Sequence, residues 1–95
     1  MDPEEYEQQL NDELDKIEKA INHLKKEKAS KRGKTIKKLE RELETTSITI
    51  EEFDIEISDL PRNQFVIFNN SLKQIQKRHK LIKQKLSNKK STLSG

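Results

Sequence analysis

The sequence predicts an all-α fold, an antiparallel up-down-up three-helix bundle that spans residues 1–86. In three separate segments, apolar residues recur at spacings of three and four, which is the pattern of an amphipathic helix. The segments are comparable in length and are joined by short turns near Gly33 and Pro61, which favours antiparallel neighbours. Each helix has one apolar stripe, so the other two helices must cover it.

The first helix is expected over residues 3–29. Asp2 is suited to be its N-cap, Pro3 takes the first helical position, and Glu5 follows three residues after the cap. Its apolar stripe consists of Tyr6, Leu10, Leu14, Ile17, Ile21 and Leu24. A short turn is expected over residues 30–34, where either Gly33 closes a helix terminus or Ser30 caps the next helix.

The second helix is expected over residues 34–58. Two of its fragments, SITI and FDIEI, are rich in β-branched residues and alternate as a strand would. The three-four spacing nevertheless continues for about seven turns, which favours a helix. Its seam consists of Ile36, Leu39, Leu43, Thr46, Ile50, Phe53, Ile57 and Leu60. Pro61 then ends the pattern.

The third helix is expected over residues 62–86. Its seam consists of Phe65, Phe68, Leu72, Ile75, His79, Ile82 and Leu86. Ile67 and Leu81 flank this seam, and we expect them to widen the core. Residues 87–95 lose the periodicity and are rich in small polar residues, so they are expected to form a flexible polar tail.

Composition favours one small domain and argues against catalysis. The chain has 95 residues, of which 29% are hydrophobic, and it has no cysteine. Its mean hydropathy is −1.07. No apolar run approaches the roughly 20 residues of a membrane span, and the acidic start does not resemble a secretory signal. The sequence contains no glycine-rich phosphate loop and no nucleophile–base pair, so we expect no enzyme activity and no cofactor. The two histidines, His23 and His79, do not suggest a metal site.

Folding the chain as a bundle separates its charges into two poles. The candidate basic pole consists of Lys25, Lys26, Lys28, Lys31, Arg32, Lys34, Lys77 and Lys80. The acidic pole consists of Asp2, Glu4, Glu5, Glu7, Glu51, Glu52, Asp54, Glu56 and Asp59. Two interpretations remain open: a solvated, highly charged surface, or a surface that binds an anionic partner such as membrane headgroups, an acidic protein or RNA. The lysines have no aromatic residues between them, which argues against nucleic acid.

Two further features suggest sites. Ile48 and Ile55 lie on the side of the second helix opposite its seam and, with Glu51 and Glu52, are a candidate partner-binding face. The alternative is that they are scattered surface residues, which need no explanation. His79 is expected on the seam near the basic pole, either as a pH-sensitive group or as an ordinary half-exposed histidine at the end of the core.

The run Glu51–Pro61, EEFDIEISDLP, together with the early Glu5–Gln8, EYEQ, resembles a known family. Over residues 4–86 the chain is similar to the N-terminal domain of vesicle-transport Qb-SNAREs, in the group named for interacting with target-membrane SNAREs. In that family an acidic second helix ends in alternating apolar and acidic residues and then reaches a proline. Residues 1–95 contain no SNARE heptads with a central glutamine, so the resemblance is to the N-terminal domain alone.

The resemblance implies a non-catalytic, monomeric interaction domain that precedes a SNARE motif and a membrane anchor. It also implies recognition by an epsin-related adaptor domain, interaction with other SNARE proteins, and a place on the cytoplasmic face of endosomal or Golgi membranes. The alternatives from composition are a basic-pole module for anionic membrane or RNA, and a small helical chaperone or scaffold.

Overall fold

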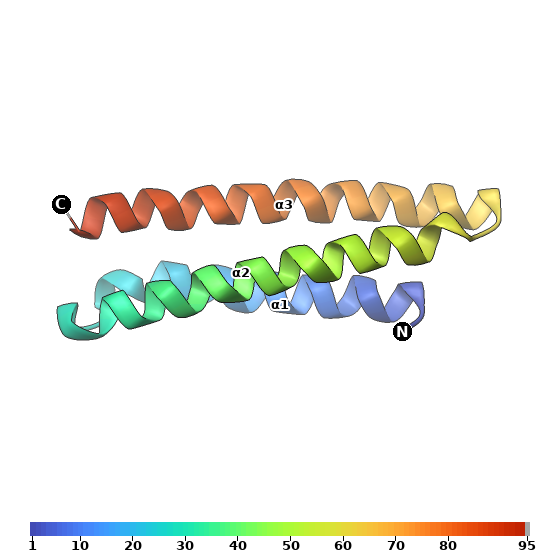
Figure 1. Ribbon diagram of the computed structural model, residues 1–95. Coiled ribbons are helices and arrows are strands. Elements are labelled where there is room, and N and C mark those ends of the chain that lie inside the picture. The colour runs from blue at the N-terminus through green and yellow to red at the C-terminus, as the bar shows by residue number, and fades with distance from the viewer. Residues whose placement is uncertain (95) are drawn as a thin grey trace.

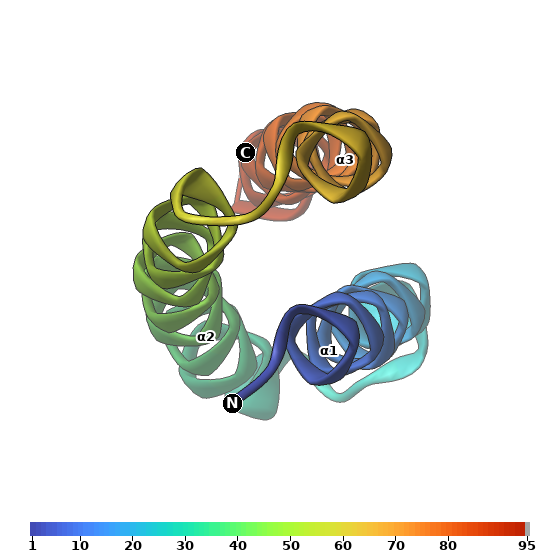
Figure 2. The same ribbon diagram turned by 90° about the vertical axis from the view of Figure 1, so that its right-hand side faces the viewer.

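The computed structural model describes residues 1–94, and within them it contains helices and turns but no strand. The elements in chain order are α1 (Pro3–His23), the 3₁₀ helix η1 (Leu24–Lys26), α2 (Ala29–Ser58) and α3 (Arg62–Ser94). The helices run up, down and up along a rod 50 Å long (Figure 1). Viewed end-on they form a triangle, so each helix contacts the other two (Figure 2). The predicted all-α, antiparallel three-helix bundle is confirmed.

Helix α1 begins as the sequence predicts. The backbone N–H of Glu5 donates to the carboxylate of Asp2 over 2.9 Å, and Pro3 occupies the first turn. The cap satisfies one of the amide groups that have no partner within the helix.

The connection between α1 and α2 differs from the expected turn over residues 30–34. Glu27 and Lys28 form it in extended conformation, and Gly33 lies inside α2 without a positive φ. Arg32 explains the difference. Its Nε donates to the Leu24 carbonyl over 3.1 Å, and its second guanidinium nitrogen donates to the Lys25 carbonyl over 2.8 Å. An arginine side chain therefore closes the end of the first helical segment, and no glycine is needed there.

The connection between α2 and α3 lies where Pro61 predicts it. Asp59 follows the last residue of α2, and the Pro61 carbonyl accepts from the Phe65 N–H over 2.8 Å. The far end of α3 differs from the expected tail, because residues 87–94 continue the helix. Half-buried Leu93 packs on the core one heptad after Leu86, which extends the apolar stripe by two turns. Gly95 lies outside the described residues.

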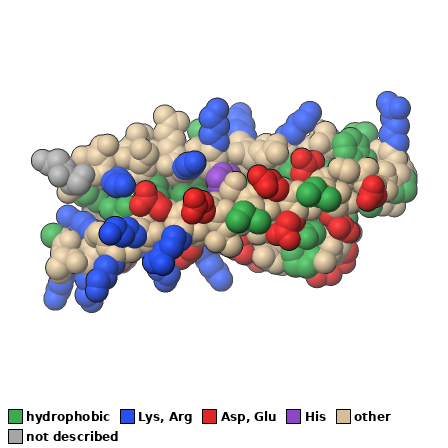
Figure 3. Space-filling model, in the orientation of Figure 1, with side chains coloured by type: hydrophobic (Ala, Val, Ile, Leu, Met, Phe, Trp, Pro, Cys, Tyr) green, Lys and Arg blue, Asp and Glu red, His purple; other side chains and the backbone are tan. Residues whose placement is uncertain are grey.

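Charged side chains are separated along the rod. Lysines and arginines gather mostly around the end where α1 meets α2, and acids gather mostly over the other half (Figure 3). Residues 44–59, which are the second half of α2 and its C-cap, contain six acids and no base: Glu44, Glu51, Glu52, Asp54, Glu56 and Asp59. Helix α3 contains bases but no acid.

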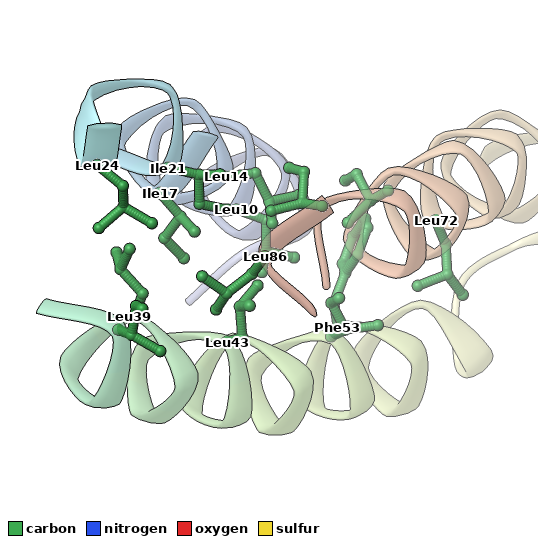
Figure 4. Close-up of a cluster of buried hydrophobic side chains, with 14 of the residues drawn as sticks. Leu10, Leu14, Ile17, Ile21, Leu24, Leu39, Leu43, Phe53, Leu72 and Leu86 are labelled. Carbon is green, nitrogen blue, oxygen red and sulfur yellow. The ribbon is translucent and has the colours of Figure 1, made fainter. Parts of the chain in front are cut away.

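The core follows the three predicted seams. In Figure 4, Ile17 and Ile21 of α1 and Leu24 of η1 point toward Leu39 and Leu43 of α2. Buried hydrophobic side chains make up the core: Leu10, Leu14, Ile17, Ile21, Leu24, Ile36, Leu39, Leu43, Ile50, Phe53, Ile57, Leu72, Ile75, Ile82 and Leu86.

Three aromatic rings close the core near the N-terminus. The Tyr6 ring stacks on Phe53 with centroids 5.9 Å apart, and Phe68 meets Phe53 edge-on at 6.4 Å. Buried Thr46 satisfies its hydroxyl by donating to the Glu42 carbonyl over 2.7 Å, so the polar atom adds no unpaired donor to the core.

The expectation that Ile67 and Leu81 widen the core is wrong, because these side chains are 66% and 57% exposed. Each lies one residue before a seam position, a rotation of about 100° around the helix. A helix in a bundle of three buries only the stripe that faces the other two, so this rotation leaves both side chains in solvent.

Candidate interaction surfaces

The outer face of α2 carries two exposed isoleucines that the core does not use. Ile48 is 59% exposed and Ile55 is 69% exposed, whereas Phe53 on the opposite side of the same helix is fully buried. The two isoleucines lie one heptad apart, about 10.5 Å along the axis, and exposed Glu51 and Glu52 lie between them on either side of the line that joins them. We call these four residues the α2 outer stripe. The structure brings them together as the sequence predicts.

The α2 outer stripe lies in a negative electrostatic environment. Within the described residues, no Lys or Arg nitrogen lies within ion-pairing distance of its glutamates or of the neighbouring Asp54. These acids also affect Tyr6. Burial is the main cause of the raised pKa of its phenol, and the negative charges of Glu52 and Glu56 raise it further. In Figure 3, green apolar side chains alternate with red acidic ones along this part of α2.

The second candidate surface lies at the corner where α1 ends and α2 begins. We call its exposed lysines the basic end: Lys25, Lys26, Lys28, Lys31 and Lys34. Arg32, which the sequence placed in the same pole, is half-buried and uses its guanidinium to hold the corner. Arg32 therefore holds the corner on which these lysines lie, and it adds its own positive charge to them.

Lys77 and Lys80 do not join the basic end. Their neighbour Arg78 forms ion pairs with Asp15 and Glu18 near the middle of α1, and the hydrogen bond to Asp15 is the main cause of its raised pKa. Lys77 and Lys80 therefore lie exposed at mid-length of the bundle, and the predicted basic pole is divided into two groups. The ion pairs of Arg78 depend on which charged positions of α1 and α3 lie opposite one another. The spacing of apolar residues in the sequence does not predict that alignment.

His79 also lies at mid-length rather than near the basic end. Its Nε2 lies 2.8 Å from the Leu43 carbonyl oxygen, so that nitrogen carries the proton and donates to the oxygen. The half-buried ring lines a groove of about 430 Å³ between α2 and α3. Lys83 and Glu44 line the same groove. The hydrogen bond to the backbone gives His79 a structural role, and the pH-switch interpretation stays a prediction.

Among residues 1–94, no three His, Asp or Glu side chains converge as metal ligands would. Within the same residues, none of the helices is both long and apolar enough to cross a membrane.

Comparison with known families identifies the domain. The family model described as "Vesicle transport v-SNARE protein N-terminus" matches residues 3–90, from the first turn of α1 almost to the end of α3. No curated protein and no solved structure matches the chain significantly.

Proposed function

The chain belongs to the vesicle transport v-SNARE N-terminus family, and from this premise we propose that it is a recognition domain that a sorting adaptor binds through the α2 outer stripe. The family is one of non-enzymatic trafficking domains. The proposed partner is an epsin-related adaptor domain, as the resemblance around Glu51–Pro61 implies. The proposed setting is the cytoplasmic face of endosomal or Golgi membranes, where the domain works beside other SNARE proteins.

One observation carries this proposal: exposed isoleucines on the face of α2 that points away from the core. Leaving Ile48 and Ile55 in water contributes nothing to folding, because neither side chain is part of the core. Apolar side chains that a partner desolvates contribute most of the binding energy in protein interfaces, while a polar rim excludes water around them. The stripe has this arrangement on a small scale, with two apolar anchors and two glutamates beside them.

The charges around the stripe define the chemistry of the adaptor surface. The segment 44–59 contributes only acids, and Glu51 and Glu52 have no basic partner in the described part of the chain. A complementary surface has an apolar depression that accepts Ile48 and Ile55 and a rim of lysine or arginine. Such complementarity accelerates association and rejects acidic competitors.

The experiment is calorimetric titration of an epsin-type adaptor domain with the chain and with the Ile48→Asp, Ile55→Asp double variant. We expect the variant to bind at least about 30-fold more weakly, because two buried apolar contacts worth about 1–2 kcal/mol each are replaced by desolvated charges. Thermal unfolding should stay close to that of the parent, since substitutions at exposed positions change stability by about 0.5 kcal/mol or less.

The matched control is the Ile67→Asp, Leu81→Asp double variant. It makes the same chemical change at two exposed apolar residues of α3, at similar exposure and on another face of the bundle. We expect the control to keep the affinity of the parent. Unchanged affinity of the α2 variant, or an equal loss in the control, would refute the assignment of the site.

A further inference from the structure

The corner between α1 and α2 concentrates positive charge to an unusual degree. Residues 25–38 contain eight bases and a single acid, Glu27. The bases are Lys25, Lys26, Lys28, Lys31, Arg32, Lys34, Lys37 and Lys38. Among the described residues, the only lysines and arginines in interhelix ion pairs are Arg78, Lys85 and Lys90, all on α3. The basic end is therefore a dense cluster of lysines, none of which forms an ion pair within the described residues, and Glu27 is the one acid in this stretch of the sequence.

Folding does not explain the three lysines of the basic end that lie at the start of α2, one at its N-cap and two in its first two turns. Lys28 is the N-cap residue of α2 and makes no side-chain cap hydrogen bond, and the first turn of α2 contains no acid. Lys31 and Lys34 follow within the first two turns. Positive charge near a helix N-terminus is repelled by the helix dipole. These three lysines oppose the formation of the helix on which they lie, which suggests that they serve another interaction.

The shape of the molecule separates the basic end from the acids. The rod is 50 Å long, whereas charges in water at physiological salt are screened over about 8 Å. A partner at the basic end therefore experiences the lysines and not the acids around the α2 outer stripe. The net charge of the whole chain, +3, understates the field at this corner.

We propose that the basic end docks this domain on the surface of an anionic phospholipid bilayer. The lysines project around the end of a rod, and the described residues of this corner include no aromatic ring that would stack on bases. Lysine is a compact hydrated charge that attracts a diffuse anionic surface without the fixed geometry of paired hydrogen bonds. The one arginine at the corner, Arg32, is used to hold the turn.

Docking by this end leaves the α2 outer stripe free. Ile48 lies 19 residues after Ala29, so it stands about 28 Å along α2 from the corner. The inference rests on family membership, which places the domain in membrane trafficking, and it does not depend on the identity of the adaptor.

The test is co-sedimentation of the chain with vesicles, without any adaptor. One set of vesicles is phosphatidylcholine alone, and the other contains one third phosphatidylserine. We expect binding only to the anionic vesicles, with affinity that falls as salt is raised, because each lysine near such a surface contributes about fivefold to partitioning. The Lys28→Glu, Lys31→Glu variant should lose at least about 25-fold in partitioning for the two lysines removed.

The variant does not lose binding through unfolding, because glutamate in the first turn of α2 favours the helix dipole and should raise the unfolding temperature. The matched control is Arg62→Glu, Lys73→Glu, which makes the same change in net charge at exposed positions of α3 away from the corner. We expect the control to retain the parent's partitioning within about threefold.

Three results would overturn the proposal. The first is no binding of the parent chain to phosphatidylserine vesicles at low salt. The second is an equal loss in the control, which would show that net charge and not the basic end is responsible. The third is tighter binding of an RNA oligonucleotide or an acidic peptide than of anionic vesicles at the same salt. None of these results bears on adaptor binding, which is measured without membranes.

Discussion

The two ends of this bundle differ in the side chains that hold the helices together. At the acidic end, where α1 begins and α2 ends, the rings of Tyr6, Phe53 and Phe68 pack on one another and Asp2 caps α1. At the basic end the core is aliphatic, and an arginine holds the corner through two backbone carbonyls. Helix α2 is charged against its dipole at both ends. Only the acidic end offsets this cost with a fully buried ring, Phe53, and two partly buried rings packed on it. We infer that stability is concentrated at that end and that the basic end is free to serve binding.

The largest effect that tests this contrast is expected from Phe53→Ala. Phe53 is fully buried and contacts a ring on each of the other two helices, so its truncation should lower the free energy of unfolding by about 3–5 kcal/mol. Leu24→Ala, at an equally buried position of the basic end, is the comparison and should cost less, about 2–3 kcal/mol. Urea denaturation measures both. An equal or larger loss at Leu24 would show that stability is not concentrated at the acidic end.

A smaller effect is expected at the corner from Arg32→Ala. The substitution removes two hydrogen bonds from a charged donor to the Leu24 and Lys25 carbonyls and should cost about 1–2 kcal/mol, since the side chain is only half-buried. Lys31→Ala is the control, because Lys31 is the exposed residue next to it and should change stability by about 0.5 kcal/mol or less. Chemical denaturation of both variants separates them. If both variants behave alike, Arg32 is one more surface charge and does not hold the turn.

A still smaller effect is expected from Asp2→Ala at the start of α1. The hydrogen bond from the Glu5 N–H lowers the pKa of Asp2 below its ordinary value of 3.8. A lowered pKa means that the ionised cap stabilises the fold fully above pH 3.8 and loses that contribution as pH falls through the folded-state pKa. Thermal unfolding should therefore show a midpoint a few degrees lower for the variant at neutral pH. The difference should shrink in strong acid, and a difference that does not depend on pH would exclude the ionised cap as its source.

The predictions from sequence succeeded where one periodicity decides the outcome and failed where a single long side chain does. Spacing of apolar residues located all three seams and the exposure of Ile48 and Ile55. The glycine at position 33 predicts the first turn over residues 30–34. In the structure the turn lies at Glu27 and Lys28, where the Arg32 side chain donates from α2 to the preceding carbonyls. No local rule shows that an arginine side chain will donate to the carbonyls of residues seven and eight positions earlier.

The same limit explains the charged surface. The sequence predicts Lys77 and Lys80 in the basic pole because they lie in the second half of the expected third helix. Helix α3 continues to Ser94, however, so both lysines lie near its middle, beside Arg78, which pairs with Asp15 and Glu18 of α1. Helix length depended on Leu93, a seam residue in a segment that otherwise reads as polar. The candidate face on α2 was predictable because its four residues lie within eight positions of one helix. The extent of the basic end was not, because it depends on how three helices align.

The smallest expected effect is a change in the pKa of Tyr6, which responds to the acidic side chains at this end of the bundle. It is the only tyrosine, and the chain has no tryptophan, so ultraviolet absorbance follows this one phenol. Burial first, and then the charges of Glu52 and Glu56, raise its pKa above 10.0. The neutral phenol is therefore favoured in the folded state, and its contribution to stability, complete below pH 10.0, is lost as pH rises through the folded-state pKa.

In Glu52→Gln, Glu56→Gln the Tyr6 midpoint should fall toward 10.0 without reaching it, because burial is the larger cause and remains. The control is Lys31→Glu, which changes a charge at the basic end, and the Tyr6 titration midpoint is measured in the same way. That charge lies several screening lengths from the phenol, so the Tyr6 midpoint should not move. A shift in that variant would mean that the ends share one electrostatic field, and the basic end could not then bind anionic lipid independently of the acids around the α2 outer stripe.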